Sequence, residues 1–419
     1  MRGVLTVETL TNHHNIMTAI LSFLKSLFPP SCHGRVVLVG GTVRDMLLGK
    51  EGDDIDLVTD LSPKELITLG FRAVEATSGV TIYFRHHPEF GAIEITRIDS
   101  LGDLEDDLRR RDFTINAMAM DLSGTHIDPL GGKEDLQVGI LRACSTQTFT
   151  IDPLRIMRAF RFETDGWSMT PETAALIREQ KWSDAFSAMP TERFSGEMLK
   201  ALARQTPELF FQRMIEFNVG AEFLPEIFRM MQIPAGPPQH HPEGDLRTHS
   251  IQVLQRVAAM STDPLARFCA FFHDLGKLAT APALYPKHHG HDNAGFGMAV
   301  VFCNRLRLSV THRKALAWTS SLHGKANKWD ELRNSSKIKM AEQAIKGEIT
   351  RILPLVSAAD KGGCVPMIGW DDAVRVARMS TRELGIDLEK LEALPFKNRA
   401  AFILQKRVNV LSTSHTSWL

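Results

Sequence analysis

The 419-residue sequence lacks a long apolar run, a net charge and closely spaced cysteines. No stretch of 18 apolar residues occurs, so we expect no membrane-spanning helix and no membrane partner. The apolar run at residues 20–28 is interrupted by Ser22, Lys25 and Ser26, and the segment before it lacks the basic character of a signal peptide. This pattern predicts an amphipathic helix.

Cysteine is sparse, and its five positions lie far apart: Cys32, Cys144, Cys269, Cys303 and Cys364. No Cys-x-x-Cys pair occurs, which argues against a cysteine-rich zinc site. An odd number of cysteines in a chain of this size indicates reduced thiols. We therefore expect a cytoplasmic protein.

Neither sign of charge is in excess, since 49 Lys and Arg residues balance 49 Asp and Glu residues. A zero sum argues against a protein that coats nucleic acid through bulk charge, and we expect no DNA partner. Residues 305–351 nevertheless hold eleven basic side chains against four acidic ones. Such a run suits contacts with the phosphates of a compact RNA, although a solvated helical face explains it equally well.

Two local patterns divide the chain. Up to about residue 145, short apolar segments alternate with turn signals, which predicts an α/β region with segments at 36–39, 55–58, 92–95 and 114–122. A helix is expected to start at Val43. After Asp152, apolar residues recur at helical spacing, which predicts helices at 171–180, 192–203, 207–217, 248–260 and 264–275.

The length exceeds what one core usually serves, so we expect two to four domains. Five proline and glycine residues between Ile233 and Pro242 indicate a linker. The expected parts are an α/β head at 1–145, a helical neck and body at 146–235, a helical domain at 240–365 and a helical C-terminal segment at 366–419.

One group of polar residues in the α/β region has the character of a phosphoryl-transfer site. Gly40 and Gly41 let the backbone approach a triphosphate, and the helix that follows favours an anion. Asp54 and Asp56 lie two apart on an expected strand and therefore point to one face, where Glu94 from another strand would join them. Carboxylates so placed can share divalent cations. The structural alternative is a plain turn followed by a solvated strand end.

Five motifs in this half resemble those of a known family. They are LVGGTVRDMLLG at 38–49, DIDLVT at 54–59, RRDFTINA at 110–117, DPLGGKEDL at 128–136 and DPLRIMRAFRF at 152–162. Together they are similar to the class II tRNA nucleotidyltransferases of the polymerase-beta-like superfamily, which also includes bacterial poly(A) polymerases. The resemblance covers residues 36 to about 162.

The resemblance implies a set of roles for matching residues. Asp54, Asp56 and Glu94 would be catalytic, with Mg²⁺ on Asp54 and Asp56. The nucleotide would be bound without a nucleic-acid template by Gly40, Gly41, Arg44, Arg110, Arg111, Asp112, Asn116, Asp152, Arg155, Arg158 and Arg161. Asp152 and Arg155, three apart on an expected helix face, would read the base of CTP or ATP; a surface salt bridge is the structural alternative.

Two departures from the family pattern bear on which nucleotides are added. The family often has a carboxylate immediately before the Asp of the last motif, whereas this chain has Ile151. Full CCA-adding members also have a longer, flexible segment where this chain has only residues 95–103. A shortened segment is typical of CC-adding members, although loops also vary in length without consequence.

A second group of polar residues lies in the C-terminal half. The adjacent His273 and Asp274, together with the distant His249 and Asp360, resemble the HD phosphohydrolase superfamily. The resemblance implies a site for Mg²⁺ or a transition metal that activates water on a phosphoester. The dense histidines at 288–291 could add a ligand or a phosphate contact, although His291 and His323, each taken alone, are more typical of structural histidines.

These observations predict an α/β polymerase-beta-like nucleotidyltransferase head followed by an all-α neck, body and HD domain. The predicted reaction adds C residues (CC or complete CCA) to the acceptor end of tRNA from CTP and ATP, with release of pyrophosphate, and the HD site adds a phosphohydrolase activity. The alternatives are a bacterial poly(A) polymerase or A-adding enzyme, and an HD-type phosphohydrolase whose head binds RNA. The lack of a basic C-terminal tail argues against the first.

Overall fold

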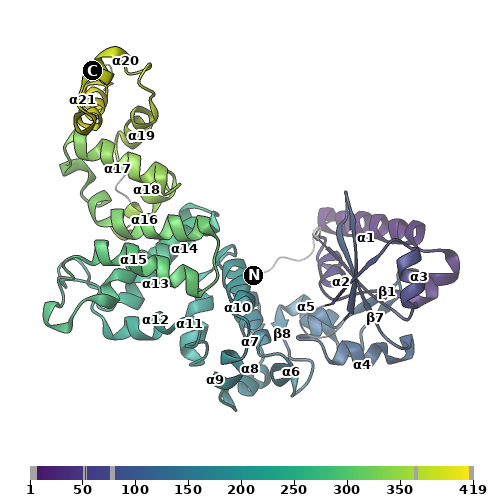
Figure 1. Ribbon diagram of the computed structural model, residues 1–419. Coiled ribbons are helices and arrows are strands. Elements are labelled where there is room, and N and C mark those ends of the chain that lie inside the picture. The colour runs from purple at the N-terminus through teal and green to yellow at the C-terminus, as the bar shows by residue number, and fades with distance from the viewer. Residues whose placement is uncertain (1–6, 51, 53, 76–80, 363–366, 415–419) are drawn as a thin grey trace. The chain divides into compact units, whose positions relative to one another are not determined.

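The computed structural model describes residues 7–50, 52, 54–75, 81–362 and 367–414, with side chains from 15 to 413. The chain forms two compact units (Figure 1). Unit 1 consists of Met1–Phe162 with Gly166–Lys181, and unit 2 of Glu163–Asp165 with Trp182–Leu419. The expected neck residues 146–162 therefore belong to the first unit, and Cys364 lies outside the described residues.

Unit 1 is built on a seven-stranded mixed sheet with the strand order β3-β4-β5-β2-β1-β6-β7. The strand β2 pairs in parallel with β5, and the other pairs are antiparallel. The strands are β1 (Val36–Val39), β2 (Asp54–Thr59), β3 (Arg72–Glu75), β4 (Thr81–His87), β5 (Gly91–Arg97), β6 (Ala119–Asp121) and β7 (His126–Ile127). All four residues of β1 are buried, as a central strand with both faces covered requires.

The helices of unit 1 flank this sheet and extend beyond it (Figure 1). They are α1 (Val7–Leu27), α2 (Gly40–Leu47), α3 (Pro63–Thr68), α4 (Leu104–Arg109), α5 (Gly132–Val138), α6 (Thr148–Ile151), α7 (Leu154–Glu163) and α8 (Pro171–Arg178). A small sheet pairs β8 (Ile140–Leu141) with β9 (Ser168–Met169). The expected α/β head followed by helices is confirmed.

Three sequence-based boundaries need correction. The helix α2 begins at Gly40, directly after β1, and not at Val43. The apolar segment 114–122 is a short 3₁₀ turn, η3 (Thr114–Asn116), followed by β6, because Asn116 is used for side-chain hydrogen bonds within a turn. The expected helix 264–275 ends at Phe272.

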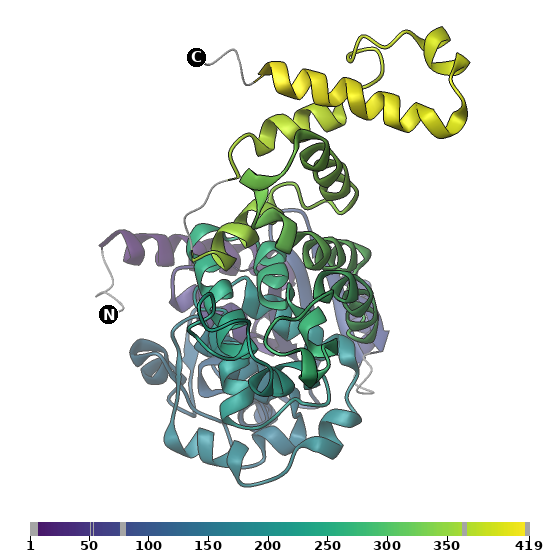
Figure 2. The ribbon, with the colours of Figure 1, turned by 90° about the vertical axis from the view of Figure 1, so that its left-hand side faces the viewer.

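Unit 2 is helical in its described residues. Its helices are α9 (Ser183–Ser187), α10 (Thr191–Leu202), α11 (Glu208–Glu216), α12 (Pro225–Arg229), α13 (Leu246–Met260), α14 (Pro264–Phe272), α15 (His291–Arg305), α16 (Val310–Ala326), α17 (Asn334–Lys346), α18 (Ile352–Asp360), α19 (Trp370–Arg378), α20 (Leu388–Ala393) and α21 (Phe396–Ser414). Aromatic rings fill the centre, with Phe211 stacked on Phe271 at 3.9 Å between centroids. The helix α21 packs on α17 and α19 (Figure 2).

The proline-rich segment at 233–242 is not a free linker, because its backbone is tied into unit 2. The Ala235 N–H donates to the Gly244 carbonyl at 2.8 Å, and Pro234 bridges to Asp245. The Lys277 ammonium donates to the Ala235 carbonyl at 2.6 Å. None of the described helices of the chain combines the length and apolar character that a membrane span requires.

Candidate active sites

The three carboxylates predicted for the head lie on adjoining strands. In the parallel register of β2 and β5, Asp54 is opposite Ala92 and Asp56 is opposite Glu94. Because side chains alternate along a strand, Asp54, Asp56 and Glu94 share one face of the sheet. Burial raises the pKa of Asp56, and Asp54 beside it adds to the rise. Burial and both aspartates raise the pKa of Glu94. Like charges held together in this way are relieved by a divalent cation.

The glycine pair closes the turn beside these carboxylates. Gly40 has a positive φ of 68°, and a Cβ there would lie 2.8 Å from Nη1 of Arg111 and 3.5 Å from Oδ2 of Asp56. Only glycine allows both this conformation and this close approach. The first turn of α2 therefore begins next to Asp56, as the sequence predicts for a triphosphate site.

A buried polar network joins three of the predicted nucleotide motifs. Arg44 donates to Oδ1 of Asn116 at 2.5 Å, and Nδ2 of Asn116 donates to Asp112 at 2.9 Å. Arg158 on α7 donates to the other oxygen of Asp112 at 2.7 Å. Burial raises the pKa of Asp112, but Arg158 and the hydrogen bonds outweigh it and lower the pKa to about 2. Asp112 is therefore an anion that holds α7 to the head.

The remaining predicted arginines occupy different surroundings. Arg111 forms an ion pair with Asp107 at 3.1 Å, and Arg110 is exposed. Arg161 is buried and lies over the ring of Phe162, with the guanidinium carbon 4.4 Å from the ring centroid.

The expected helix face shared by Asp152 and Arg155 is wrong. Asp152 lies between α6 and α7 with an extended backbone, and its carboxylate accepts the Leu154 N–H at 3.2 Å. The Arg155 guanidinium donates to the backbone carbonyls of Arg110 and Arg111, at 2.7 and 3.2 Å. Burial lowers the pKa of Arg155. The hydrogen bonds of Arg155 hold the backbone of the RRDFTINA motif at 110–117 in place. Recognition of the nucleotide base by Asp152 and Arg155 stays a prediction.

In unit 2, the four predicted HD residues converge at the ends of three helices. The Nε2 atom of His249 lies 3.5 Å from Asp274 and 3.1 Å from Asp360. The Nε2 atom of His273 lies 3.2 Å from Asp274 and 3.8 Å from Asp360. All four side chains are less than 10% exposed. The structure therefore brings the four predicted residues together in one cluster.

Two further histidines belong to this cluster, and the sequence pointed to one of them, His291, only through the dense histidines at 288–291, which it offered as a further ligand or phosphate contact. His291 and His323, which taken alone resembled structural histidines, point their Nε2 atoms at Oδ1 of Asp274, at 3.5 and 3.2 Å. The other oxygen of Asp274 faces His249 and His273. The density of histidines at 288–291 was the available signal, and only the packing of α15 against α16 brings its last member to His323.

The donor set fits a metal ion. Imidazole nitrogens and carboxylate oxygens lie within 4.8 Å of one another in groups of three, such as His249, His273 and Asp274. The Nε2 atoms of His249 and His273 and Oδ1 of Asp274 are buried, yet none makes a hydrogen bond of acceptable geometry within the described residues. Buried polar atoms without partners indicate a bound group.

The surroundings also shift the pKa values of residues in this cluster. Burial lowers the pKa of His249, but Asp360 and Glu243 outweigh it and raise the pKa to about 9. Burial likewise opposes the effect of Asp274 on His323, whose pKa rises to about 9. Burial raises the pKa of Asp274, but Lys277, His273 and a hydrogen bond with His323 outweigh it and hold that pKa well below its usual range. Metal binding to these histidines displaces their protons.

The basic run at 305–351 is partly neutralised within the protein. Arg305 pairs with Glu226 at 2.6 Å, and Lys314 pairs with Glu348 at 3.2 Å. Lys337 lies over the ring of Trp329 at 4.9 Å. The residues left exposed stay a predicted RNA contact.

Three family models match successive parts of the chain. The model of the poly(A) polymerase head domain matches residues 36–100 and 80–142. A model described as a probable RNA and SrmB-binding site of polymerase A matches 166–231, and the HD domain model matches 246–361. The fold and sites thus define a nucleotidyltransferase head joined to an HD domain, a metal-dependent class of enzyme.

Comparison with individual relatives identifies the family within this class of enzyme. The multifunctional CCA protein of Methylococcus capsulatus is 35% identical over 345 residues, which cover 78% of this chain and 81% of the relative. That of Alkalilimnicola ehrlichii is 36% identical over 325 residues, which cover 74% and 78%. The chain therefore belongs to the family of multifunctional CCA proteins, the CCA-adding tRNA nucleotidyltransferases. This confirms the main prediction and supports neither the poly(A) polymerase alternative nor the RNA-binding-head alternative.

Solved structures show the same fold. A CCA-adding enzyme in complex with CTP has a TM-score of 0.65 at 19% identity, with 95% of this chain and 94% of that chain covered. The Thermotoga maritima CCA-adding enzyme complexed with tRNA has a TM-score of 0.64 at 18% identity, with 97% and 98% covered.

Proposed function

We propose that this protein completes the 3′ end of tRNA by adding C, C and A from CTP and ATP. In each step the terminal RNA hydroxyl attacks the α-phosphate of the nucleotide, one P–O bond forms, and pyrophosphate leaves. The observation that carries this proposal is the register of β2 and β5, which puts Asp54, Asp56 and Glu94 on one face beside the Gly40 turn.

The roles in this site follow from its geometry. Asp54 and Asp56 would hold Mg²⁺, which when bound activates the RNA hydroxyl and neutralises the departing pyrophosphate. The Gly40–Gly41 turn admits the triphosphate, and Arg44 and Arg111 supply positive charge next to Asp56. Asp112 and Asn116 hold Arg158 and Arg44 in place, so the arginines need no reorganisation when the nucleotide binds.

The short segment after β5 favours a second candidate, an enzyme that adds CC alone. Only Ile98, Asp99 and Ser100 separate β5 from η2 (Leu101–Asp103), and the Ile98 N–H is bonded to the Thr59 carbonyl at 2.9 Å. A connection of this length leaves little room for a flexible segment that would change the specificity of the nucleotide pocket from CTP to ATP.

Nucleotide supply distinguishes the two candidates. We expect tRNA that ends at the discriminator base to gain two residues with CTP alone, three with CTP and ATP, and none with ATP alone. The products are resolved on sequencing gels, with tRNA ending in CC as the control substrate for A addition. Extension that stops at two residues with both nucleotides identifies a CC-adding enzyme. Addition of A, with ATP alone, to the tRNA that ends at the discriminator base contradicts both candidates.

We further propose that the HD cluster hydrolyses phosphoesters with a divalent metal on His249, His273, Asp274 and Asp360. A metal at these donors, Mg²⁺ or a transition metal, would supply activated water. Lys277 lies 2.7 Å from Asp274 and faces the same cavity, where its charge suits a phosphate. The free state of the four described cysteines supports a reducing, cytoplasmic location for both activities.

Metal removal tests this second activity. We expect the full-length protein, stripped with a chelator, to lose hydrolysis of p-nitrophenyl phosphate and of a 2′,3′-cyclic nucleotide. Mg²⁺, Mn²⁺, Co²⁺ and Ni²⁺ are then added back singly, and the ion that restores the rate identifies the functional metal. Hydrolysis that survives chelation, or that no ion restores, contradicts the proposal.

A further inference from the structure

The histidines of the HD cluster are oriented in two different ways. The Nδ1 atoms of His273, His291 and His323 each face a backbone carbonyl three residues earlier, at 2.8, 2.8 and 3.0 Å. His249 instead places Nδ1 2.7 Å from Oε1 of Glu243. In every case Nδ1 is occupied, and Nε2 is directed at the carboxylates. His249 alone is oriented by a side-chain anion.

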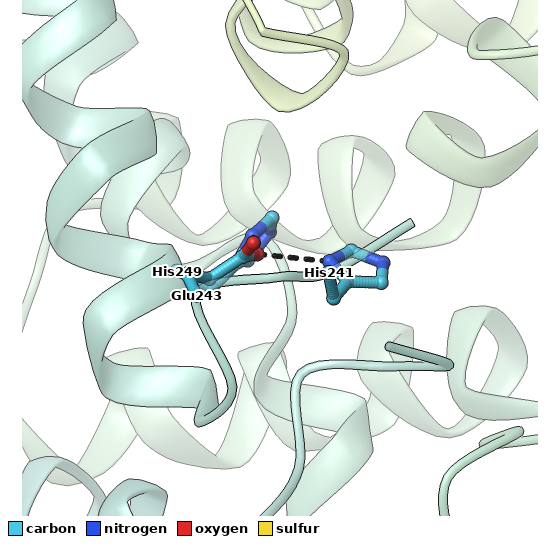
Figure 3. Close-up of side chains that lie close together, drawn as sticks. All are labelled: His241, Glu243 and His249. Atoms are coloured by element: carbon cyan, nitrogen blue, oxygen red, sulfur yellow. Dashed lines mark hydrogen bonds and ion pairs between the residues drawn. The ribbon is translucent and has the colours of Figure 1, made fainter. Parts of the chain in front are cut away.

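Glu243 holds two imidazoles at once. The same oxygen, Oε1, lies 2.9 Å from Nδ1 of His241, and the rings of His241 and His249 are nearly perpendicular with centroids 5.0 Å apart (Figure 3). The Glu243 side chain is only 9% exposed. His241, Glu243 and Lys277 line a cavity of about 990 Å³ that also reaches His291 and Asp360.

The position of Glu243 is fixed by the folded segment before α13. Asp245 caps α13 by accepting the N–H groups of Arg247 and Thr248, both at 3.0 Å. On the N-terminal side of Glu243, the His241 N–H donates to the Pro237 carbonyl at 3.0 Å. The backbone on either side of Glu243 is therefore anchored, and its carboxylate is delivered to His249 in one orientation.

We propose that Glu243 is a positioning residue of the HD site, which holds His249 with Nε2 toward Asp274 and Asp360 and ties His241 into the cavity wall. A carboxylate behind a metal-binding histidine fixes its tautomer and ring orientation and increases its basicity toward a metal. The backbone carbonyls behind the other three histidines fix orientation without a full negative charge. This inference rests on the proposed metal at the HD donors.

Metal affinity tests the inference apart from catalysis. The reference is the full-length protein with Asp54→Ala and Asp56→Ala, so that bound Mn²⁺ reports unit 2. Free Mn²⁺ is measured by electron paramagnetic resonance for Glu243→Gln and Glu243→Ala in this reference. The matched control is Glu208→Gln, because Glu208 is another buried glutamate of unit 2, bonded to Gln255 at 3.2 Å.

We expect Glu243→Gln to weaken Mn²⁺ binding by about 10- to 100-fold, since loss of an outer partner typically has this effect. Glu243→Ala weakens it further, because the amide of glutamine retains one acceptor. Glu208→Gln leaves the affinity unchanged. NMR of ¹⁵N-labelled histidine provides a second readout, in which the Nδ1–H form of His249 persists in the reference and is lost in Glu243→Ala.

Two failures are distinguishable. If His273→Ala leaves Mn²⁺ binding of the reference intact, the proposed metal site itself is wrong. If His273→Ala abolishes binding while Glu243→Gln binds as the reference does, only the role of Glu243 is overturned. Thermal melting checks that each variant folds. If Glu243→Gln does not fold, Glu243→Asp is measured in its place. If Glu243→Asp then binds Mn²⁺ no more tightly than Glu243→Ala does, the inference is contradicted.

Discussion

Asp112 shows how one residue links the sequence motifs of the head into a single site. Its carboxylate accepts from Asn116 within its own motif and from Arg158, 46 residues later on α7. The resemblance to the nucleotidyltransferase family implied that Asn116 and Arg158 both belong to the nucleotide site. It did not predict that Asp112 is buried behind the arginine, because burial depends on how α7 packs on the head.

The ion pair of Asp112 with Arg158 and its hydrogen bonds predict a fold that is sensitive to acid. A folded pKa of about 2 lies below the ordinary 3.8, so the charged form of Asp112 stabilises the protein above about pH 4, and this contribution is lost as the pH falls through 2. Asp112→Asn should lower the free energy of unfolding by about 2 kcal/mol at pH 7 and by much less at pH 2. Urea unfolding followed by circular dichroism at both pH values measures the difference.

Asp99→Asn serves as the control for that measurement. Asp99 pairs with Arg97 at 3.3 Å, but its side chain is 94% exposed. An exposed pair contributes little to stability, so the variant should unfold as the wild type does at each pH. Equal losses at pH 7 and pH 2 in Asp112→Asn would contradict the assignment of Asp112 as a buried anion.

Individual residues also show which parts of the two sites could be predicted from the sequence and which could not. Asp54, Asp56 and Glu94 were predicted together because strand periodicity and a family motif both point to them. His291, His323 and Glu243 have no such pattern, since each reaches the HD cluster through tertiary packing. A histidine near a helix end is uninformative until its Nε2 atom is seen to face a shared carboxylate.

At the scale of elements, the HD cluster depends on the close packing of η5 (Leu275–Ala279) against α15. A Cβ added at Gly276 would lie 2.0 Å from the carbonyl oxygen of His291 and 2.7 Å from the Gly295 nitrogen. Glycine at 276 is therefore needed for close approach, and Lys277, the next residue, reaches the Ala235 carbonyl. The sequence showed the Asp-Leu-Gly-Lys run, but not the helix against which its glycine packs.

Gly276→Ala should separate η5 from α15 and displace the backbone of His291. We expect a loss of about 1–3 kcal/mol in the stability of unit 2, as overpacking typically causes, together with loss of metal-dependent phosphoester hydrolysis. Gly297→Ala, also on α15, has nothing within 4 Å of its added Cβ and should be neutral or slightly stabilising. Thermal unfolding and hydrolysis assays compare the two variants. If Gly276→Ala and Gly297→Ala had the same stability and the same hydrolysis rate, the packing argument would be contradicted.

At the scale of the whole molecule, zero net charge is consistent with an enzyme that selects one compact RNA. Positive groups are concentrated at the head motifs and in residues 305–351, and carboxylates elsewhere balance them. The helical spacing of apolar residues predicted four helices of unit 2, at 192–203, 207–217, 248–260 and 264–275, but none of the helices from α15 onward. The proline-rich segment at 233–242 was predicted to be a linker. The prolines and the glycine of this segment instead turn the backbone beside the HD cluster. Composition alone does not distinguish such a fixed turn from a flexible linker.

Each donor set lies within one compact unit, so the two reactions should be separable in the intact chain. Asp54→Ala is expected to abolish CTP incorporation into tRNA and to leave metal-dependent hydrolysis within about twofold of the wild type. His273→Ala should have the opposite effect, because it removes an Nε2 donor of the HD cluster and no group of the head. Both rates are measured on the same preparations, with circular dichroism as the check on folding. If folded His273→Ala also lost nucleotide incorporation, the head would depend on the HD cluster, and two independent catalytic units would no longer describe the molecule.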